Sequence, residues 1–264
     1  MEPAVLYQDE NILVVDKPAG MVVNRADTTR GIKTLQDWVD KQVHSSQFPS
    51  GVLGVGTVHS SRDYIVNGYN KLEEFKSRSG IVHRLDKETS GIIIIAKNPE
   101  TFINLQNQFK KGEVRKTYLT LLHGKLEPTE GIINSPIGRL PWNRTRFGIL
   151  PEGRKASTSY KVLSHKIYRN KNSDEILSLV EVYPKTGRTH QIRVHFQSMN
   201  HPVFGDELYA GRKTGKSDRK VLPRHFLHAS KIKLKDPQTQ KELVIQSNLP
   251  LDLATFLDSL PEAS

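Results

Sequence analysis

The sequence predicts an α+β fold with a mixed, mainly antiparallel sheet and flanking helices, because strand-like segments outnumber helical ones and do not alternate with them regularly. The 264 residues are enough for one large domain with a sizeable core. We expect a single domain over residues 1–264, with its core within 5–250. Residues 45–80 are rich in Ser and Gly and have no sustained period, which predicts a long loop or insertion.

The individual elements follow from periodicity and from turn residues. Leu6 and the run 12–15 predict two short strands around a turn at 8–10. The β-branched run Ile92–Ala96 predicts a buried strand, and Asn98 with Pro99 then begins a helix that ends at Gly112. Further strands are predicted at 114–122, 157–163, 176–183, 228–234 and 243–246, and further helices at 33–43, 189–199 and 252–260.

The charge of the chain indicates a polyanionic partner. Lys and Arg number 39 against 28 Asp and Glu, which gives a net charge of +11 and a pI of about 9.7. Residues 137–171 hold nine basic residues against Glu152 alone, and residues 211–235 hold nine against Asp218 alone. Such clusters attract nucleic acid, and the binding weakens as salt rises. A solvated basic surface without a partner is the alternative interpretation.

Composition also excludes several classes of protein. The chain has no cysteine, which rules out disulfides, iron–sulfur clusters and Cys-based zinc sites. Its longest aliphatic run, Ile92–Ala96, is far shorter than the ~20 residues that cross a bilayer. The N-terminus has neither a basic and apolar secretory signal nor an Arg-rich transit helix, so we expect a cytoplasmic protein without membrane contact.

Two polar segments are candidates for chemistry. Residues 83–91 (HRLDKETSG) precede the predicted buried strand, and Asp86 is suited to act as a nucleophile or base if a nearby Arg keeps it ionised. From the spacing alone, a surface turn with local ion pairs is the better interpretation. Residues 185–195 (KTGRTHQIRVH) place Arg193 off the apolar face of a predicted helix. His190 and His195 do not share a helix face, so metal binding has little support.

Two further patterns are less specific. Residues 210–217 (AGRKTGKS) match a permissive phosphate-binding loop, but no buried strand precedes them and no helix is predicted after them. We therefore interpret this segment as a basic surface loop. Tyr118, in Lys116-Thr117-Tyr118, lies in a predicted strand. It is either a packing residue or, in a cleft beside Arg and Asp, a residue that stacks on a base.

Taken together, these segments resemble the RluA family of pseudouridine synthases. The segment 83–86 followed by Thr89-Ser90-Gly91 is similar to the family signature. Four other segments resemble further family motifs in the expected order: 9–20 (DENILVVDKPAG) the opening strand and Lys-Pro-x-Gly turn, 116–118 the Lys-x-Tyr motif, 186–195 the arginine motif, and 201–206 (HPVFGD) the stretch after it. The resemblance covers roughly residues 5–250.

The resemblance implies a single catalytic domain with a basic central cleft, which isomerises uridines in structured RNA, either 23S ribosomal RNA or transfer RNA. It implies that Asp86 is the catalytic carboxylate and that Tyr118 lies against the flipped base. Arg193 would pair with Asp86 and keep it ionised, and Arg84 would enter the RNA where the uridine leaves the stack. It implies no metal and no cofactor. Further RNA contacts are expected from His83, Arg144, Arg146 and Arg188.

The sequence also departs from the family pattern. Many members carry a small S4 RNA-binding domain ahead of the catalytic one, whereas this sequence starts at the catalytic domain. We therefore expect the cleft and its loops to select the RNA, including a basic loop at 142–146. Tyr64 and Tyr69 of the segment 45–80 either touch the RNA, which we favour slightly, or only hold the loop in place. We expect a monomer without an obligate protein partner.

Two other classes of function remain open. The first is an RNA-binding or ribosome-assembly factor that has lost catalysis, although the presence of Asp86, Tyr118 and Arg193 argues against it. The second is a nucleotide hydrolase built on Lys216, which the sequence around the loop does not support.

Overall fold

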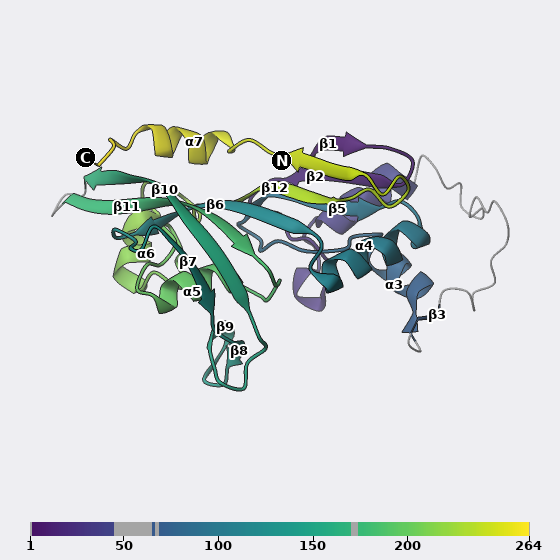
Figure 1. Cartoon of the computed structure of the whole chain (residues 1–264), viewed down its shortest axis with the longest axis horizontal. Helices are drawn as coiled ribbons and strands as arrows, with labels where there is room; N and C mark the ends of the chain where they lie inside the picture. The colour runs from purple at the N-terminus through teal and green to yellow at the C-terminus, as the bar shows by residue number, and fades with distance from the viewer. Residues whose placement is uncertain (1, 45–64, 67–68, 170–173, 264) are drawn as a thin grey trace. The chain divides into compact units, whose positions relative to one another are not determined.

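The computed structural model describes residues 2–44, 65–66, 69–169 and 174–263 of the chain (Figure 1). The chain forms two compact units. The first unit comprises residues 1–87, 91–114 and 233–245, and the second comprises residues 88–90, 115–232 and 246–264. The segment 83–91 therefore contributes residues to both units. The single domain over residues 1–264 stays a prediction.

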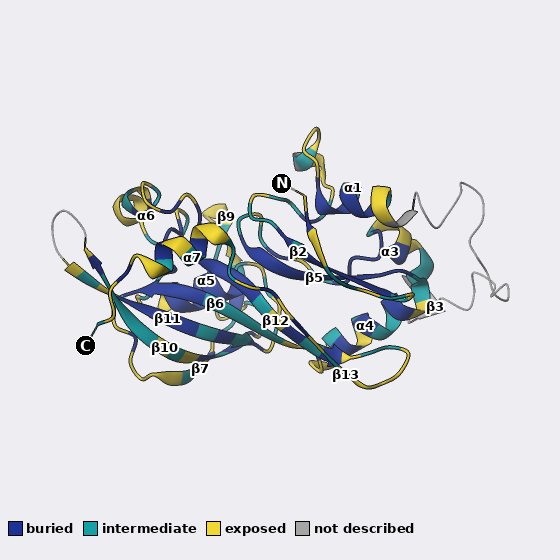
Figure 2. Cartoon of the chain, turned by 90° about the horizontal axis from the view of Figure 1, so that it is seen from above, coloured by how far each residue is buried: buried dark blue, intermediate teal, exposed yellow. Residues whose placement is uncertain are grey.

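Strands β1, β2 and β5 form an antiparallel sheet in the first unit. β1 (Ala4–Gln8) pairs with β2 (Ile12–Lys17), which pairs with β5 (Ser90–Ala96). Every residue of β5 is buried because the sheet is covered on both faces, and Figure 2 shows β2 and β5 mostly in dark blue. Asp9 closes the turn between β1 and β2 by accepting hydrogen bonds from the backbone N–H groups at positions 11 and 12, both at 2.7 Å. These strands confirm the prediction.

The last strands of the chain are also as predicted. β12 (Leu227–Lys235) has its first six residues in the second unit and its last three in the first. β13 (Glu242–Gln246) pairs with β12. A turn lies between them, where Asp236 Oδ1 accepts hydrogen bonds from the backbone N–H groups at positions 238 and 239.

The first predicted helix is present but changes its geometry. After a short 3-10 turn, η1 (Asp27–Thr29), α1 (Leu35–Val39) begins at Thr34, whose hydroxyl accepts a hydrogen bond from the N–H of Asp37. It continues as a π-helical turn, η2 (Asp40–His44).

The expected long loop at 45–80 is wrong for its last part. Residues 65–66 and 69–70 form the short pair β3 (Ile65–Val66) and β4 (Tyr69–Asn70), and α3 (Lys71–Ser77) follows. Asn70 caps α3 by accepting hydrogen bonds from the N–H groups at 72 and 73, and the buried Phe75 ring meets Phe102 edge to face at 5.7 Å. Cap and buried aromatic together specify this helix. Residues 45–64, with Tyr64, lie outside the described residues, as does the side chain of Tyr69.

α4 (Pro99–Lys111) confirms both predicted ends. The side chain of Asn98 accepts a hydrogen bond from the N–H of Thr101 at 2.9 Å, and Pro99 occupies the first turn. Gly112 ends the helix in the left-handed conformation at φ +72°, which a residue without Cβ adopts readily.

Five antiparallel strands form the sheet of the second unit, in the order β12-β6-β11-β10-β7. They are β12, β6 (Arg115–His123), β11 (Asp174–Pro184), β10 (Ser157–Arg169) and β7 (Glu130–Asn134). β10 extends six residues past the predicted end because it pairs with β11 as far as Arg169↔Asp174. β7 was not predicted. The mixed α+β architecture with a mainly antiparallel sheet is confirmed.

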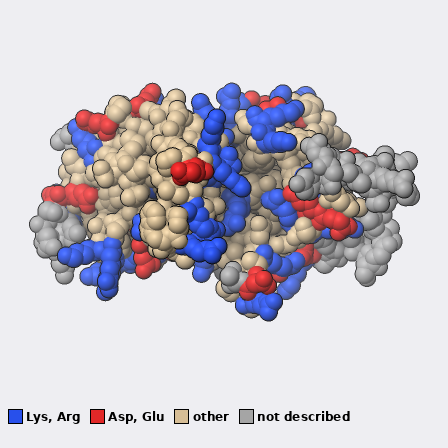
Figure 3. All heavy atoms as spheres, turned by 90° about the horizontal axis from the view of Figure 1, so that it is seen from below, with Lys and Arg blue, Asp and Glu red and all other residues tan. Residues whose placement is uncertain are grey.

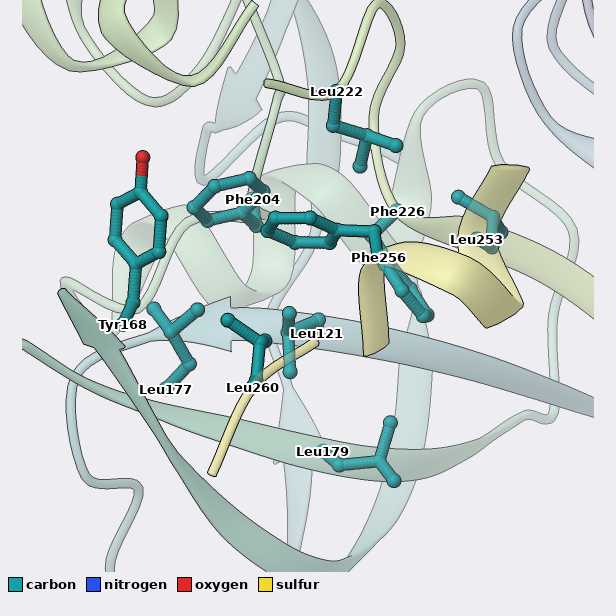
Figure 4. Close-up of a cluster of buried hydrophobic side chains, with 10 residues drawn as sticks. All are labelled: Leu121, Tyr168, Leu177, Leu179, Phe204, Leu222, Phe226, Leu253, Phe256 and Leu260. Atoms are coloured by element: carbon teal, nitrogen blue, oxygen red, sulfur yellow. The ribbon is translucent and has the colours of Figure 1, made fainter. Parts of the chain in front are cut away.

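Helices cover both faces of this second sheet (Figure 1). Because neighbouring side chains of a strand point to opposite faces, Leu121 and Leu179 face α7 (Leu251–Asp258), while Leu122 and Val180 face α5 (Gln191–Ser198). Figure 4 shows the first of these clusters, where Phe256 stacks on Phe204 with ring centroids 4.9 Å apart. α7 and α5 confirm the two predicted helices at 252–260 and 189–199.

Two segments differ from their predictions. The basic stretch expected as a loop belongs to a β-hairpin of β8 (Ile137–Leu140) and β9 (Asn143–Ile149), with Trp142 at its turn and 77% exposed. The expected basic surface loop at 210–217 is mostly helical, as α6 (Arg212–Asp218). Because α6 already begins at Arg212, the residues before Gly215 that a phosphate-binding loop leaves open to surround phosphates are helical here. Among the described residues, no helix is long and apolar enough to span a membrane.

Candidate active site

The segment that carries Asp86 is held by backbone contacts in the first unit. Asp86 is partly buried, while Arg84 is exposed. The Lys87 carbonyl accepts hydrogen bonds from Lys17 Nζ at 3.1 Å and from the N–H of Gly20 at 2.8 Å. Lys17 is fully buried and also donates to the carbonyls at 18 and 21. The Lys-Pro-x-Gly turn therefore fixes the backbone one residue after Asp86.

His83 is tied to the same unit. Its Nε2 accepts a hydrogen bond from the N–H of Ile94 at 3.0 Å, so the proton of the neutral ring is on Nδ1. The ring lies 5.0 Å from that of Phe109. These contacts give His83 a packing role, and its contact with RNA stays a prediction.

The next three residues, 88–90, are held by side chains of the second unit. Glu88 forms a two-point salt bridge with Arg219, at 2.7 and 3.0 Å, and lies 3.3 Å from His225 Nδ1. Burial raises the pKa of Glu88, but hydrogen bonds from His225 and Arg219 outweigh burial and hold that pKa well below its usual range. Thr89 Oγ1 is hydrogen-bonded to His225 Nε2 at 2.8 Å.

Arg224 makes a second set of contacts with this segment. Its Nη1 donates to the carbonyl of Glu88 at 3.2 Å and to Ser90 Oγ at 3.1 Å, while its other nitrogens pair with Asp252. Arg219 and Arg224 belong to the basic cluster at 211–235 that was expected to attract nucleic acid. The structure instead uses both in internal ion pairs, because each lies beside a carboxylate that is distant in the sequence.

Tyr118 lies on β6, opposite Val182 of β11. It is partly buried and packs against the cluster that contains Ile192 of α5, so the second unit brings it close to the helix that carries Arg193. Two residues earlier, Lys116 donates to the Thr186 carbonyl at 3.3 Å, and burial lowers the pKa of Lys116 to about 8. Tyr118 is therefore a partly buried strand residue that packs on the same cluster as helix α5.

Arg193 is buried and forms a salt bridge with Asp206. Its Nε and Nη2 donate to Oδ2 and Oδ1 of Asp206 at 2.6 and 2.9 Å, and the Asp206 side chain is fully buried. Burial raises the pKa of Asp206, but the bonds from Arg193 outweigh burial and lower it. The sequence analysis did not find this pair, and the predicted pairing of Arg193 with Asp86 stays a prediction.

The β8–β9 hairpin carries two of the predicted RNA contacts. Arg144 is exposed, and Arg146 is partly buried with its guanidinium carbon 5.2 Å from the centre of the Tyr209 ring. Arg188 is partly buried and donates from Nε to the Lys155 carbonyl at 3.1 Å. On the face drawn in Figure 3, Lys and Arg side chains occupy more of the surface than Asp and Glu. This surface is compatible with a polyanionic partner.

Metal ligands are not grouped in the part of the chain that the structure describes, where no cluster of three or more His, Asp or Glu residues is placed to hold an ion. His195 uses both ring nitrogens, with Thr158 Oγ1 at 2.8 Å and the Ser135 carbonyl at 3.0 Å. The expectation that neither metal nor cofactor is needed stays a prediction.

Comparison with known proteins gives a consistent result. Residues 11–198 match the sequence model of a family described as RNA pseudouridylate synthase. The chain is 33% identical over 259 residues to "Ribosomal large subunit pseudouridine synthase D" of Nitrosomonas europaea, covering 97% of this chain and 64% of that protein. It is 35% identical over 249 residues to "Uncharacterized RNA pseudouridine synthase YhcT" of Bacillus subtilis, covering 94% and 69%. The chain thus spans somewhat less than two thirds of the first of these relatives.

Solved structures agree on the fold. The human protein "RNA Pseudouridylate Synthase Domain Containing 1" aligns with a TM-score of 0.65 at 25% identity, covering 100% of this chain and 97% of that one. The human "RNA Pseudouridylate Synthase Domain Containing 4" aligns with a TM-score of 0.66 at 23% identity, which supports the fold alone.

Proposed function

Because this chain belongs to the RNA pseudouridylate synthase family, we propose that it converts uridine to pseudouridine in structured RNA, with Asp86 as the catalytic carboxylate. The observation that carries the proposal is the family match over residues 11–198, which includes Asp86, Tyr118 and Arg193. The reaction is an isomerisation. The bond from the sugar C1′ to uracil N1 breaks, the uracil turns, C1′ bonds to C5, and the C5 proton leaves while N1 gains one.

Asp86 acts on the uridine as an ionised carboxylate, either by attack or by stabilising the reacting group. Its partial burial supports this role, because a carboxylate that is partly removed from water interacts more strongly with a nearby substrate. The Lys87 carbonyl, held by Lys17 and Gly20, supports a fixed backbone at the next residue. Preorganised groups of this kind lower the cost of reaching the transition state.

Tyr118 and Arg193 complete the proposed catalytic set. Tyr118 lies against the flipped base, and its position on β6 beside the Ile192 cluster supports an orientation shared with α5. Arg193 keeps Asp86 ionised, and the fork of hydrogen bonds to Asp206 holds its guanidinium plane in one orientation. We further propose that Arg84 enters the RNA where the uridine leaves the stack, and that His83, Arg144, Arg146 and Arg188 contact the RNA.

Large-subunit ribosomal RNA is the substrate that we propose first, because the relative from Nitrosomonas europaea is named for it. Transfer RNA is the second substrate to compare. The proposal includes action as a monomer in the cytoplasm, without metal or organic cofactor.

The experiment is pseudouridine mapping of total RNA from a strain that lacks this protein. The strain is complemented with wild type, with Asp86→Asn, or with Asp27→Asn, which makes the same charge change at an exposed position. We expect wild type and Asp27→Asn to restore one or a few sites and Asp86→Asn to restore none. Sites restored by Asp86→Asn would refute the catalytic role of Asp86. A growth defect rescued by Asp86→Asn, with no site changed, would indicate a binding role instead.

A further inference from the structure

Tyr209 contacts both the β8–β9 hairpin and the start of helix α5 within the second unit. The Tyr209 ring is 4% exposed and belongs to a cluster with Ile137 of β8 and Val194 of α5, with Phe147 of β9 packed against it. Tyr209 is therefore enclosed by both elements. The proposed mechanism assigns it no role.

The hydroxyl of Tyr209 contacts both elements with one oxygen. It accepts a hydrogen bond from the N–H of Phe147 at 2.9 Å and is hydrogen-bonded to His190 Nδ1, also at 2.9 Å. Since a hydroxyl has one proton to donate, it can donate to His190 while it accepts from Phe147. One oxygen thus spans the hairpin and the residue that starts α5.

His190 needs such support. Its backbone is in the left-handed conformation at φ +57°, which residues with a Cβ adopt only when their surroundings hold them. The Tyr209 and Phe147 rings both meet the imidazole edge to face at 5.6 Å. Arg193 lies three residues further along the chain, so the two rings, which Tyr209→Phe retains, also support the start of the helix that carries its guanidinium.

The ring of Tyr209 also contacts two guanidinium groups. The guanidinium carbons of Arg193 and Arg146 lie 5.0 and 5.2 Å from the ring centre, within the range of cation–π attraction. Arg146 Nε is buried and has no hydrogen-bond partner among the described residues. The ring therefore sets the distance between an arginine of the proposed catalytic set and one of the proposed RNA contacts.

We propose that Tyr209 is a positioning residue that fixes the RNA-binding hairpin to helix α5. The hydroxyl holds the hairpin through Phe147, and the ring holds Arg193. This inference rests on the proposed function. The two parts of Tyr209 can be removed separately, because Tyr209→Phe deletes the hydroxyl and keeps the ring, whereas Tyr209→Leu deletes both.

The test measures RNA affinity and the rate of pseudouridine formation at saturating RNA in a single turnover, using the full chain and the RNA identified by mapping. Tyr209→Phe should weaken affinity about three- to tenfold, the size of one lost hydrogen bond, and leave the rate within about twofold. Tyr209→Leu should weaken affinity similarly and also lower the rate about tenfold or more, because Arg193 loses the ring. Equal rates for Tyr209→Leu and Tyr209→Phe would overturn the role of the ring.

A double-mutant cycle tests the role of the hydroxyl. Arg144→Ala, at the exposed end of the hairpin, should weaken RNA affinity several-fold in wild type and within about twofold in Tyr209→Phe, because the hairpin has already lost its fixed position. Equal losses in both backgrounds would overturn the proposal. Hydrogen exchange of residues 143–149 needs no RNA, and it should be faster in Tyr209→Phe than in wild type. Unchanged exchange would overturn the hydroxyl role even if the chain proves inactive on every RNA, which separates this inference from the proposed function.

Discussion

The most deeply buried lysines and arginines that the structure describes in the two units differ in whether they have a carboxylate partner. In the first unit, Lys17 and Lys97 are buried and donate to backbone carbonyls, Lys17 to those at 18, 21 and 87 and Lys97 to that of Asp9. In the second unit, Arg193 and Arg224 are buried and pair with the carboxylates of Asp206 and Asp252. His123 is buried as well and lies between two carboxylates, at 2.9 Å from each.

The two kinds of partner fix different parts of the protein, namely the backbone in the first unit and side chains in the second. A carbonyl partner lets a lysine fix a stretch of backbone, as Lys17 does beside Asp86, whatever the side chain at that position is. A carboxylate partner orients a side chain, because a guanidinium and a carboxylate match in two parallel hydrogen bonds. In the first unit, the lysine therefore fixes the backbone conformation of the segment next to Asp86. In the second unit, the carboxylates fix the orientation of the Arg193 and Arg224 side chains.

The largest effect is expected from breaking a buried carboxylate pair. Asp206→Asn removes the carboxylate that accepts two hydrogen bonds from the buried Arg193 guanidinium, which should lower the free energy of unfolding by about 3–5 kcal/mol and abolish most of the activity. Urea unfolding and pseudouridine formation measure the two effects. Asp258→Asn makes the same change at an exposed position of α7 and serves as the control. Equal losses in the two variants would show that the carboxylate does not hold Arg193.

A smaller effect is expected from the carbonyl-bound lysine. Lys17→Met removes a charged donor from three carbonyls, and we expect a loss of about 2–3 kcal/mol in the free energy of unfolding, with slower pseudouridine formation. Lys87→Ala is the matched control, because it removes an exposed side chain and keeps the carbonyl that Lys17 binds. If Lys87→Ala impairs the rate as much as Lys17→Met does, the side chain rather than the backbone of residue 87 is what matters.

The pH dependence of stability should reveal His123, which lies between two carboxylates. Burial lowers the pKa of His123, but hydrogen bonds to Asp218 and Glu175 outweigh burial and raise it to about 9. A pKa raised by folding contributes stability that is fully present below the unfolded value of 6.5 and lost as the pH rises through 9. The free energy of unfolding should fall by about 3 kcal/mol over this window, and His123→Gln should not show that fall.

Because Lys116 also changes charge in this pH range, the free energy of unfolding of wild type must be compared with that of His123→Gln. Its pKa is lowered by burial to about 8, so its contribution to stability rises between pH 8 and 10.5, in the direction opposite to that of His123. The difference between wild type and His123→Gln at each pH removes this contribution. A difference that stays constant from pH 6.5 to 9 would contradict a charged His123 at neutral pH.

The smallest effect is expected where a carboxylate pair is exposed. Lys161 and Glu130 lie 3.1 Å apart with side chains 55% and 65% exposed. Water and salt screen such pairs, so Lys161→Ala should change the free energy of unfolding by less than about 0.5 kcal/mol. A larger loss in urea unfolding would mean that carboxylate pairing alone, without burial, stabilises the second unit.

Local sequence signals predicted most of the elements. The cap at Asn98, the stop at Gly112 and the β-branched run before Ala96 act over a few residues, so the sequence alone was sufficient to place α4 and β5. The prediction failed at α3, α6 and the β8–β9 hairpin. In α3 a buried Phe75 specifies the helix, and its contact with Phe102 is not visible in the local pattern.

The candidate site was predictable as residue identities and not as contacts. The motifs around Asp86, Tyr118 and Arg193 are contiguous strings, and they were sufficient to indicate the family. The partners that hold these segments are distant in the chain. Glu88 meets Arg219, 131 residues away, and Thr89 meets His225, 136 residues away. No local period or spacing predicts such pairs.

The sequence by itself determined the family, the chemistry that the family implies, and the elements whose signals are local. The tertiary structure alone decided which of the many basic residues, like Arg219 and Arg224, pair with carboxylates inside the second unit. It also decided that Tyr209 joins the β8–β9 hairpin to α5. The physical reason is that burial and charge pairing depend on which residues meet in space, and a sequence motif specifies only residues that are adjacent along the chain.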